Sequence, residues 1–132
     1  PLFRLKTGDV RLASKQLSCN QSIAADGFFS IAMMVDFTGS IGDHGAWFYR
    51  NLYWETGVIG QVLYLESEAQ GARSTGIGCY FDDHVHELLD IKDMSYQVLY
   101  HFTIGISIED IRLTTLPPYL NEDLRHDTSG QY

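Results

Sequence analysis

The sequence predicts a three-layer protein of the α+β or α/β class, in which one long helix packs on a small β-sheet. Three observations support this class: a helical pattern over residues 46–70 that is apolar almost all round, and two apolar runs with strand character at 28–37 and 97–106. Helices and strands pack as layers because each has to bury an apolar face. We therefore expect helices to cover the faces of the sheet.

Size and charge limit the class of protein further. With 132 residues and 45% hydrophobic content, the chain has the size and composition of one globular domain spanning 1–132. It carries 9 Lys and Arg against 17 Asp and Glu, for a net charge of -8. This balance argues against nucleic acid or an anionic membrane as partner, since phosphate contacts need concentrated positive charge. The apolar runs are too short to span a bilayer, and no signal peptide is visible.

The cysteine content indicates the cellular compartment. Cys19 and Cys79 are the two cysteines of the chain, which is too few for the disulfide frameworks of small secreted domains. We therefore expect a cytoplasmic location. Pro1 fits two origins, the residue left after removal of an initiator methionine or a cut within a longer chain.

The first part of the chain predicts a short helix, a strand and a loop. Residues 9–17 have helical spacing, and Asp9 is the predicted N-cap. The run at 28–37 lacks that spacing and is bounded by turn residues, which predicts a strand buried on both faces. Three glycines between 38 and 45 predict a loop.

The long helix over 46–70 is central or lies in a subunit interface, because its apolar residues cover most of its circumference. Gly57 and Gly60 lower its helix propensity, which suggests that another backbone or a flat ligand approaches closely there. Gly71 is the predicted C-cap. Four aromatic residues of this helix fit either stacking on a ligand or anchoring a buried interface: Tyr49, Tyr53, Trp54 and Tyr64.

The remaining elements complete a small sheet. Residues 72–81 predict an irregular extended stretch, followed by a short helix over 84–89 that Asp82 and Asp83 cap. Residues 97–106 predict a second central strand. The tail from Leu116 contains two prolines and is expected to be extended, packed on a neighbour or loose. Two strands make a poor sheet, so the termini, a second subunit or a companion domain must supply more.

Several of these segments resemble the nitroreductase family in their order and spacing. They read GVIGQVLYLESEAQG at 57–71, TGIGCYFDD at 75–83, VHELL at 85–89, LYHFTIG at 99–105 and EDIRL at 109–113, with a weaker match over 21–37. They look most like the branch of SagB-type dehydrogenases, which oxidise azoline rings in peptides. The resemblance implies a partial α+β three-layer fold of nitroreductase type, corresponding to the C-terminal half of that domain.

The resemblance also implies a cofactor and a site. Family members bind FMN at a homodimer interface, which the helix over 46–70 would form with its twin. The residues from Gly76 through Gly78 and Cys79 to Tyr80 would run beside the flavin ring, with amides near 78 and 79 donating to its N5/O4 edge. Arg112 matches the position of a basic residue that binds the FMN phosphate, and it could instead pair with Glu109 or Asp110 on the surface.

One departure from the family concerns the phosphate site. The family carries an N-terminal motif of the type R-R-S-x-R, whereas Arg4, Lys6 and Arg11 are scattered here. Either a companion polypeptide supplies this half of the site, or FMN binding has been lost or weakened.

Other candidate residues have plainer interpretations. Five potential metal ligands at 82–87 fit helix capping better than a metal site, because helical neighbours two apart do not face each other: Asp82, Asp83, His84, His86 and Glu87. Cys79 fits a packing role better than that of a nucleophile. His101 fits a satisfied core histidine, and no triad can be assembled around it.

Two functions remain open from the sequence. The first is an FMN-linked oxidoreductase module that acts on a small molecule or peptide, as a homodimer or with a companion N-terminal polypeptide; its catalytic residues and substrate are not identified. The second is a truncated, dimeric binding or structural protein that has lost the flavin.

Overall fold

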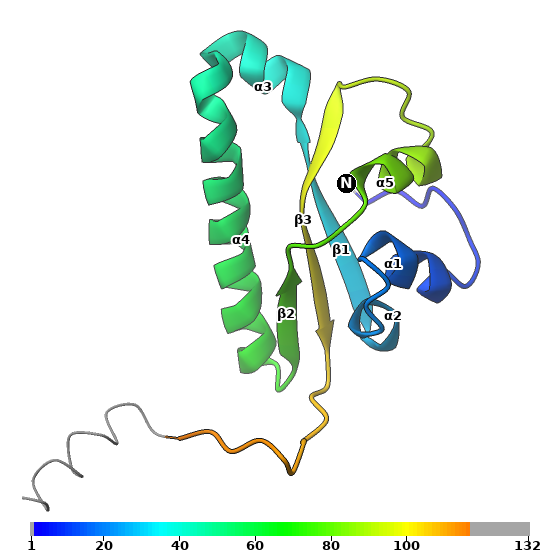
Figure 1. Ribbon diagram of the computed structural model, residues 1–132, viewed down its shortest axis with the longest axis vertical. Coiled ribbons are helices and arrows are strands. Elements are labelled where there is room, and N and C mark those ends of the chain that lie inside the picture. Colours follow the sequence, from blue (N-terminus) through cyan, green and yellow to red (C-terminus); the bar gives the residue numbers. More distant parts are fainter. Residues whose placement is uncertain (1, 117–132) are drawn as a thin grey trace, which may run out of the picture.

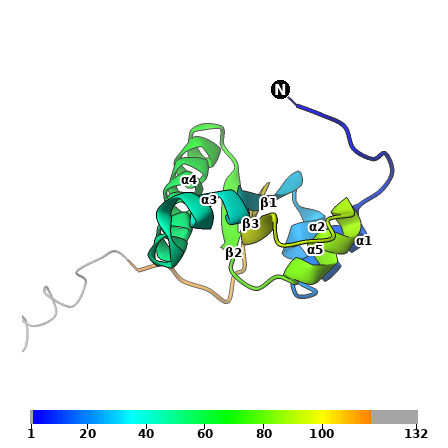
Figure 2. The ribbon, with the colours of Figure 1, turned by 90° about the horizontal axis from the view of Figure 1, so that it is seen from above.

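The structure is a three-layer α+β arrangement with one long helix on one face of a sheet and three short helices on the other. This computed structural model describes residues 2–116. Figure 1 shows α4 on one side, with α3 next to its upper end, and α1, α2 and α5 on the other side, and Figure 2 shows the same layers from above. The elements in chain order are α1 Arg11–Leu17, α2 Ile23–Asp26, β1 Phe29–Asp36, α3 Phe37–His44, the 3-10 turn η1 Ala46–Phe48, α4 Tyr49–Ala69, β2 Arg73–Ile77, α5 Asp82–Leu89 and β3 Tyr96–Gly105.

The sheet is built around β3. Its three strands are antiparallel in the order β1-β3-β2, so β3 pairs with a neighbour on each side. Six of its ten residues lie in the interior, and Phe102 is fully buried. The strand and central position predicted for 97–106 are therefore confirmed. Met33 pairs with Tyr100 and Met34 with Val98, which leaves Leu99 as the extra residue of a bulge.

The predicted burial of the first strand on both faces is wrong. Residues 29–36 do form β1, but Met33 is its one buried residue. The reason is its position, because β1 lies at the end of the strand order and has β3 as its sole described neighbour.

Two stretches expected to be irregular have regular structure. Residues 38–45 belong largely to α3, because the Asp36 carboxylate accepts a hydrogen bond from the amide of Gly39 at 2.9 Å and caps the helix. Within 72–81, the strand β2 forms because Arg73 to Ile77 pair with β3.

The predicted caps of two short helices are also corrected. The Asp9 carboxylate binds the amide and guanidinium of Arg11, and α1 begins at Arg11 without a side-chain cap. Helix α5 already includes Asp82 and Asp83 in its first turn.

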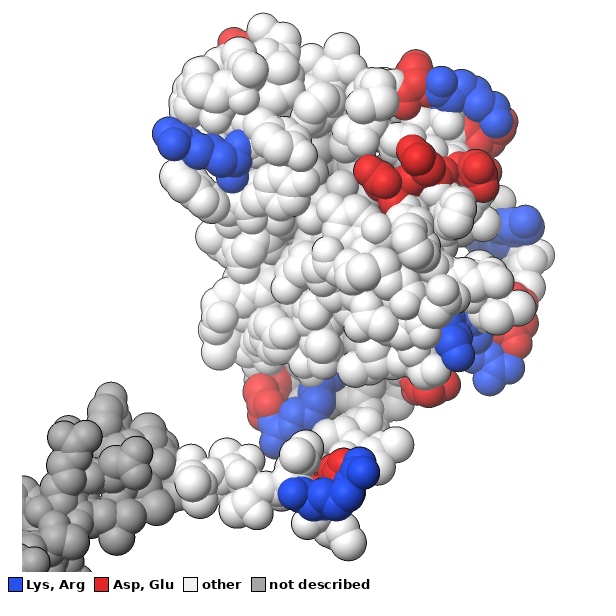
Figure 3. All heavy atoms as spheres, in the orientation of Figure 1, with Lys and Arg blue, Asp and Glu red and all other residues white. Residues whose placement is uncertain are grey.

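The long helix is confirmed over Tyr49–Ala69, and Gly71 follows it with a φ of 71°. Gly60 lies on its inner face, where a Cβ would meet the Tyr100 and Phe102 rings at 3.4 and 3.6 Å. Gly57, in contrast, faces open space. The outward face of α4 exposes five large apolar residues: Trp54, Val58, Ile59, Val62 and Leu65. In Figure 3 charged side chains gather near the margins of the view, and a broad area between them carries none.

Helix α2 is attached to the sheet through Thr103 of β3. The Thr103 hydroxyl lies 3.2 Å from the carbonyl of Ile23 and 3.3 Å from that of Phe29. Ser30 of β1 donates to the carbonyl of Ala24 at 2.7 Å. These bonds place α2 against β1 and β3 at a closely packed corner that contains Gly27.

No helix within residues 2–116 is both long and apolar enough to cross a membrane. Pro1 and the predicted extended tail after Leu116 lie outside the described residues.

Replacing Gly27 with Ala should destabilise the chain by about 1–3 kcal/mol, because a Cβ there would lie 2.6 Å from the Thr103 hydroxyl and 2.8 Å from the Ile104 carbonyl. Gly42→Ala is the matched control, since Gly42 lies in α3 with no atom near its missing Cβ and gains about 1 kcal/mol in helix propensity. Urea unfolding measures the free energy of unfolding of both variants. Equal midpoints for the Gly27→Ala variant and the wild type would contradict the packing at this corner.

Candidate functional site

The candidate site consists of the end of β2 and the segment through which the chain then leaves the sheet and crosses to α5 (Figure 1). It contains four of the predicted site residues. Gly76 is the first, and it lies within β2, where its amide donates to the Tyr64 hydroxyl of α4 at 2.8 Å. A side chain at this position would collide with Tyr100, so the space beside Gly76 is filled by the chain itself.

Gly78 has different surroundings. Apart from its two neighbours along the chain, no atom of the described residues lies within 4 Å of the place where its Cβ would be, and both Gly78 and Cys79 are exposed. Within residues 2–116, neither of their amides donates a hydrogen bond to the protein. Two adjacent free donors beside an open glycine form a small polar surface to which a flat acceptor group can come close.

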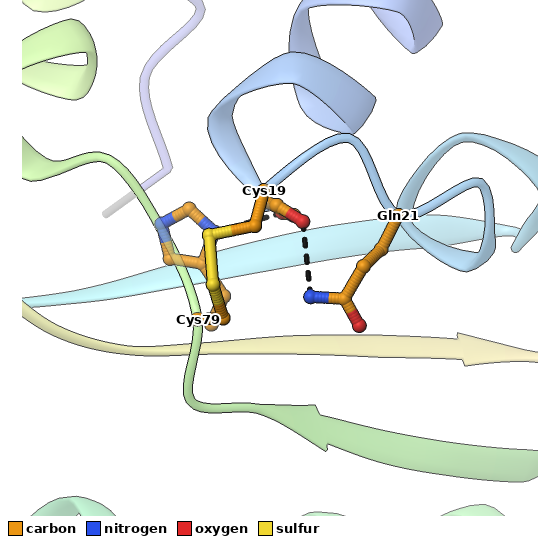
Figure 4. The surroundings of a disulfide bond; sticks show 5 residues. Cys19, Gln21 and Cys79 are labelled. Carbon is orange, nitrogen blue, oxygen red and sulfur yellow. Dashed lines mark hydrogen bonds between the residues drawn. A yellow bond between two sulfur atoms is a disulfide. The ribbon is translucent and has the colours of Figure 1, made fainter.

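Cys79 is joined to Cys19 by a disulfide bond, with the two Cα atoms 5.7 Å apart. Figure 4 shows this bond and the neighbouring Gln21, whose side-chain amide donates to the Ser18 carbonyl at 3.0 Å. The predicted packing role of Cys79 as a small buried residue is wrong. Spacing along the chain could not indicate the bond, because 60 positions separate the two cysteines.

Tyr80 fixes the far end of the segment. Its ring stacks on His101 with centroids 4.9 Å apart, and its hydroxyl donates to the Val98 carbonyl at 3.2 Å. The next amide, that of Phe81, donates to the Leu17 carbonyl at the end of α1 at 2.9 Å. Burial raises the pKa of Tyr80, so the phenol stays protonated. Residues 80 and 81 are therefore held by both β3 and α1.

His101 lies directly beneath this anchor. It is 4% exposed, and its Nδ1 lies 3.0 Å from the hydroxyl of the equally buried Ser18. Its Nε2 has no partner among the described residues. Burial lowers the pKa of His101. The predicted core role of His101 is confirmed by its burial, although one ring nitrogen stays unsatisfied.

A cleft of about 520 Å³ opens on the other side of Tyr80. Tyr49 and Tyr53 line it from α4, with their hydroxyls 2.9 Å apart. Burial is the main cause that raises the pKa of Tyr53. The four aromatic residues predicted together are thus separated by the structure, because Trp54 points outward and Tyr64 points toward β2. The cleft is completed by Phe37, Ile41, Ala46, Asp82, Met94, Gln97, Val98 and Leu99.

Arg112 lies away from this segment, in the stretch after β3. Its guanidinium makes a forked ion pair with Asp110, with distances of 2.9 and 2.6 Å. This hydrogen bond raises the pKa of Arg112 and lowers that of Asp110. The surface pairing considered from the sequence is therefore present, and the guanidinium is itself exposed.

No group of three potential metal ligands comes together within residues 2–116. The dense run at 82–87 is spread along the exposed N-terminal turns of α5.

Comparison with known proteins identifies the fold. No protein-family model matches the chain, and neither does any curated protein. A solved structure from Anabaena variabilis, assigned as a nitroreductase, is 30% identical with a TM-score of 0.71, covering 76% of this chain and 20% of that one. Nitroreductase A from Vibrio parahaemolyticus is 14% identical, with a TM-score of 0.62 and coverage of 93% and 62%. An NADPH:FMN oxidoreductase from Vibrio harveyi is 14% identical, with a TM-score of 0.60 and coverage of 92% and 69%.

These structures establish that residues of this chain adopt part of the nitroreductase fold. The chain spans 20% of the Anabaena structure, 62% of nitroreductase A and 69% of the NADPH:FMN oxidoreductase. The predicted three-layer α+β fold of nitroreductase type is therefore confirmed as a partial fold.

The stability of the chain should fall as the pH drops below about 6.5, the ordinary pKa of histidine, because of His101. Its pKa is lowered in the folded state, so below its ordinary value the unfolded chain binds a proton that the folded chain excludes. The free energy of unfolding falls by at most about 1.4 kcal/mol per pH unit. Urea unfolding at a series of pH values measures this loss. The free energy of unfolding should change less with pH in His101→Asn, because asparagine keeps a hydrogen-bond partner for Ser18 and does not titrate. Parallel slopes in the two proteins would exclude His101 as the cause.

Proposed function

We propose that the chain is an FMN-linked oxidoreductase module of nitroreductase type, acting on a small molecule or a peptide. The observation that carries this proposal is the open face of Gly78, flanked by the free amides of Gly78 and Cys79 on a segment held at its far end. The similarity to FMN oxidoreductases of known structure supports it. Within that family, the sequence of residues 75–83 favours the branch of SagB-type dehydrogenases, and 1–132 correspond to the C-terminal half of the domain.

The residues present fit the edge of a flavin. A planar ring can approach the main chain only where no Cβ intervenes, which is the case at Gly78. Amides whose direction is fixed by the backbone then donate to ring acceptors and stabilise negative charge on the reduced ring. When bound, FMN supplies the two-electron redox chemistry itself. The contribution of the protein is to orient the ring and to provide these donors, with Tyr80 packed behind them.

The phosphate end of the cofactor fits less completely. Arg112 is exposed and carries the planar fork that suits a phosphate, but Asp110 already accepts from its Nε and one of its Nη atoms. A phosphate must therefore displace the Asp110 carboxylate or share the guanidinium with it. The remaining contacts would come from a second copy of the chain or from a companion N-terminal polypeptide.

The outward face of α4 supports a protein partner on that side. Trp54 and Val58 are 64% and 66% exposed, and Val62 and Leu65 continue the same face. A contiguous exposed apolar surface of this kind is typical of an interface. We propose that α4 packs against its twin in a homodimer, with a companion polypeptide as the alternative.

A second function is favoured by the pairing of Arg112 with Asp110. In this alternative the guanidinium is a surface ion pair, the phosphate site is absent, and the chain is a non-catalytic binding or structural protein that kept the α4 interface.

Addition of FMN to the purified chain should give a flavin absorption band that stays with the protein through gel filtration, at a mass that corresponds to a dimer. Gly78→Val should weaken FMN binding by about tenfold or more, because its side chain fills the space that the ring needs. Gly42→Val, at an equally open glycine of α3, is the control and should bind normally. A colourless wild-type protein would contradict the proposal.

Arg112→Gln should weaken FMN binding by about tenfold while leaving riboflavin binding unchanged, because riboflavin lacks the phosphate. Arg11→Gln is a close control, since Arg11 makes the same forked pair with Asp9 two residues away. Fluorescence titration with each flavin measures the affinities. Equal affinity of the wild type and Arg112→Gln for FMN would favour the surface ion pair as the role of Arg112.

A further inference from the structure

The disulfide between Cys19 and Cys79 joins the end of α1 to the segment after β2, which carries the candidate site. Cys19 follows α1, and Cys79 lies inside the segment that leaves β2. Close to the bond, the Phe81 amide donates to the Leu17 carbonyl at 2.9 Å. The covalent bond and this hydrogen bond are therefore two adjacent links between α1 and the candidate site.

The disulfide is open to solvent at one of its two ends. Cys79 is exposed, whereas Cys19 is partly buried. The chain neighbour of Cys79, Gly78, has no side chain and is exposed as well. Thiol–disulfide exchange requires that a thiolate reaches one sulfur, and access decides which sulfur is attacked. The geometry favours attack at Sγ of Cys79.

The fold has other links that do not need the disulfide. The core cluster consists of Met33, Ala72, Phe102 and Ile104, and neither cysteine contributes to it. Helix α1 is also attached through the Ser18 hydroxyl to His101 at 3.0 Å. The Ser14 hydroxyl donates to the Ala24 carbonyl at 2.8 Å. We therefore expect reduction to loosen the segment locally without unfolding the chain.

The backbone next to the disulfide has an unfavourable conformation that can relax once the bond opens. Cys19 has a φ of 52° and Asn20 a φ of 58°, both in the left-handed region. Asn tolerates that region, whereas a cysteine there is costly and persists where its surroundings impose it. The bond to Cys79 is one of those constraints.

We propose that Cys19–Cys79 is a redox-active disulfide that exchanges with small dithiols in the folded protein, and that its state controls the position of the amides at 78 and 79. A thiolate of the dithiol attacks Sγ of Cys79, the disulfide breaks, and Cys19 leaves as a thiolate that takes up a proton. The second thiol of the dithiol then attacks the mixed disulfide and releases Cys79. Two electrons and two protons pass to the protein, and the dithiol becomes a cyclic disulfide.

The oxidised state is the one that holds the segment in place. With the bond closed, the amides of Gly78 and Cys79 are fixed between β2 and the Tyr80 anchor. With the bond open, no hydrogen bond within residues 2–116 holds the amides of Gly78 and Cys79. A ligand that needs these donors pays more ordering entropy in the reduced state, so it should bind more weakly. This last consequence rests on the proposed function, whereas the exchange itself does not.

Dithiothreitol acting on the native 132-residue chain tests the proposal. Alkylation and mass spectrometry should show two free thiols per chain while the far-ultraviolet circular dichroism stays native. Hydrogen exchange at the Phe81 amide should speed up by about tenfold or more, which corresponds to about 1.4 kcal/mol of opening free energy. The Ala72 amide, bonded to Ser67 at 2.9 Å in the opposite layer, is the internal control and should not change.

The double variant Cys19→Ser with Cys79→Ser should exchange like the reduced wild type and should not respond to dithiothreitol. Three results would overturn the proposal: two free thiols in the protein as isolated in air, resistance to dithiothreitol until denaturant unfolds the chain, or identical Phe81 exchange before and after reduction. The wild-type measurements decide the proposal even where the double variant fails to fold.

FMN titration of the oxidised and reduced chain separates the two proposals. Weaker binding on reduction supports both. Absence of FMN binding in either state would contradict the proposed function, while the thiol count and the exchange rates still decide whether the disulfide is redox-active. Equal FMN affinity in the two states would overturn the control of the amides by the disulfide.

Discussion

The burial of β3 on both of its faces is the constraint on which the rest of this structure depends. A strand in the middle of a sheet must be covered by other elements on each side, because its side chains alternate between the two faces. Phe102 points toward α4 and contacts Tyr64, with ring centroids 4.9 Å apart. His101 and Thr103, its neighbours in sequence, contact α1 and α2. The two helical layers are thus placed by adjacent residues of a single strand.

Polar residues within β3 give the short helices their positions. A buried hydroxyl or imidazole must find a partner, and here the partners lie on α1 and α2. Ser18 lies opposite His101, and the carbonyl of Ile23 lies opposite Thr103. These pairs bring the end of α1 next to the segment after β2. The Cys19–Cys79 bond and the hydrogen bond from Phe81 to Leu17 form at that meeting point.

The candidate site follows from the way the chain leaves the sheet. Strand β2 ends at Ile77, whereas β3 continues past it, so the next residues are free of ladder pairing. Gly78 and Cys79 keep unpaired amides there, while Tyr80 and Phe81 are anchored again. A partial nitroreductase fold does not by itself establish an activity, because function depends on the site that the fold carries. The site here offers donors to a flat acceptor, whereas Arg112 is paired with Asp110 on the surface.

Elements that depend on neighbouring residues could be predicted from the amino-acid sequence. The helix over Tyr49–Ala69, its end before Gly71 and the central strand Tyr96–Gly105 follow from periodicity and glycine placement, which are properties of neighbouring residues. Tertiary structure alone decided the edge position of β1, the regular pairing of β2, the helix α3 in place of a loop, and the bond between two cysteines 60 positions apart. It also separated Gly76, covered by Tyr100, from the open Gly78. These features depend on contacts between residues that are far apart in the sequence, and such contacts cannot be inferred from local spacing.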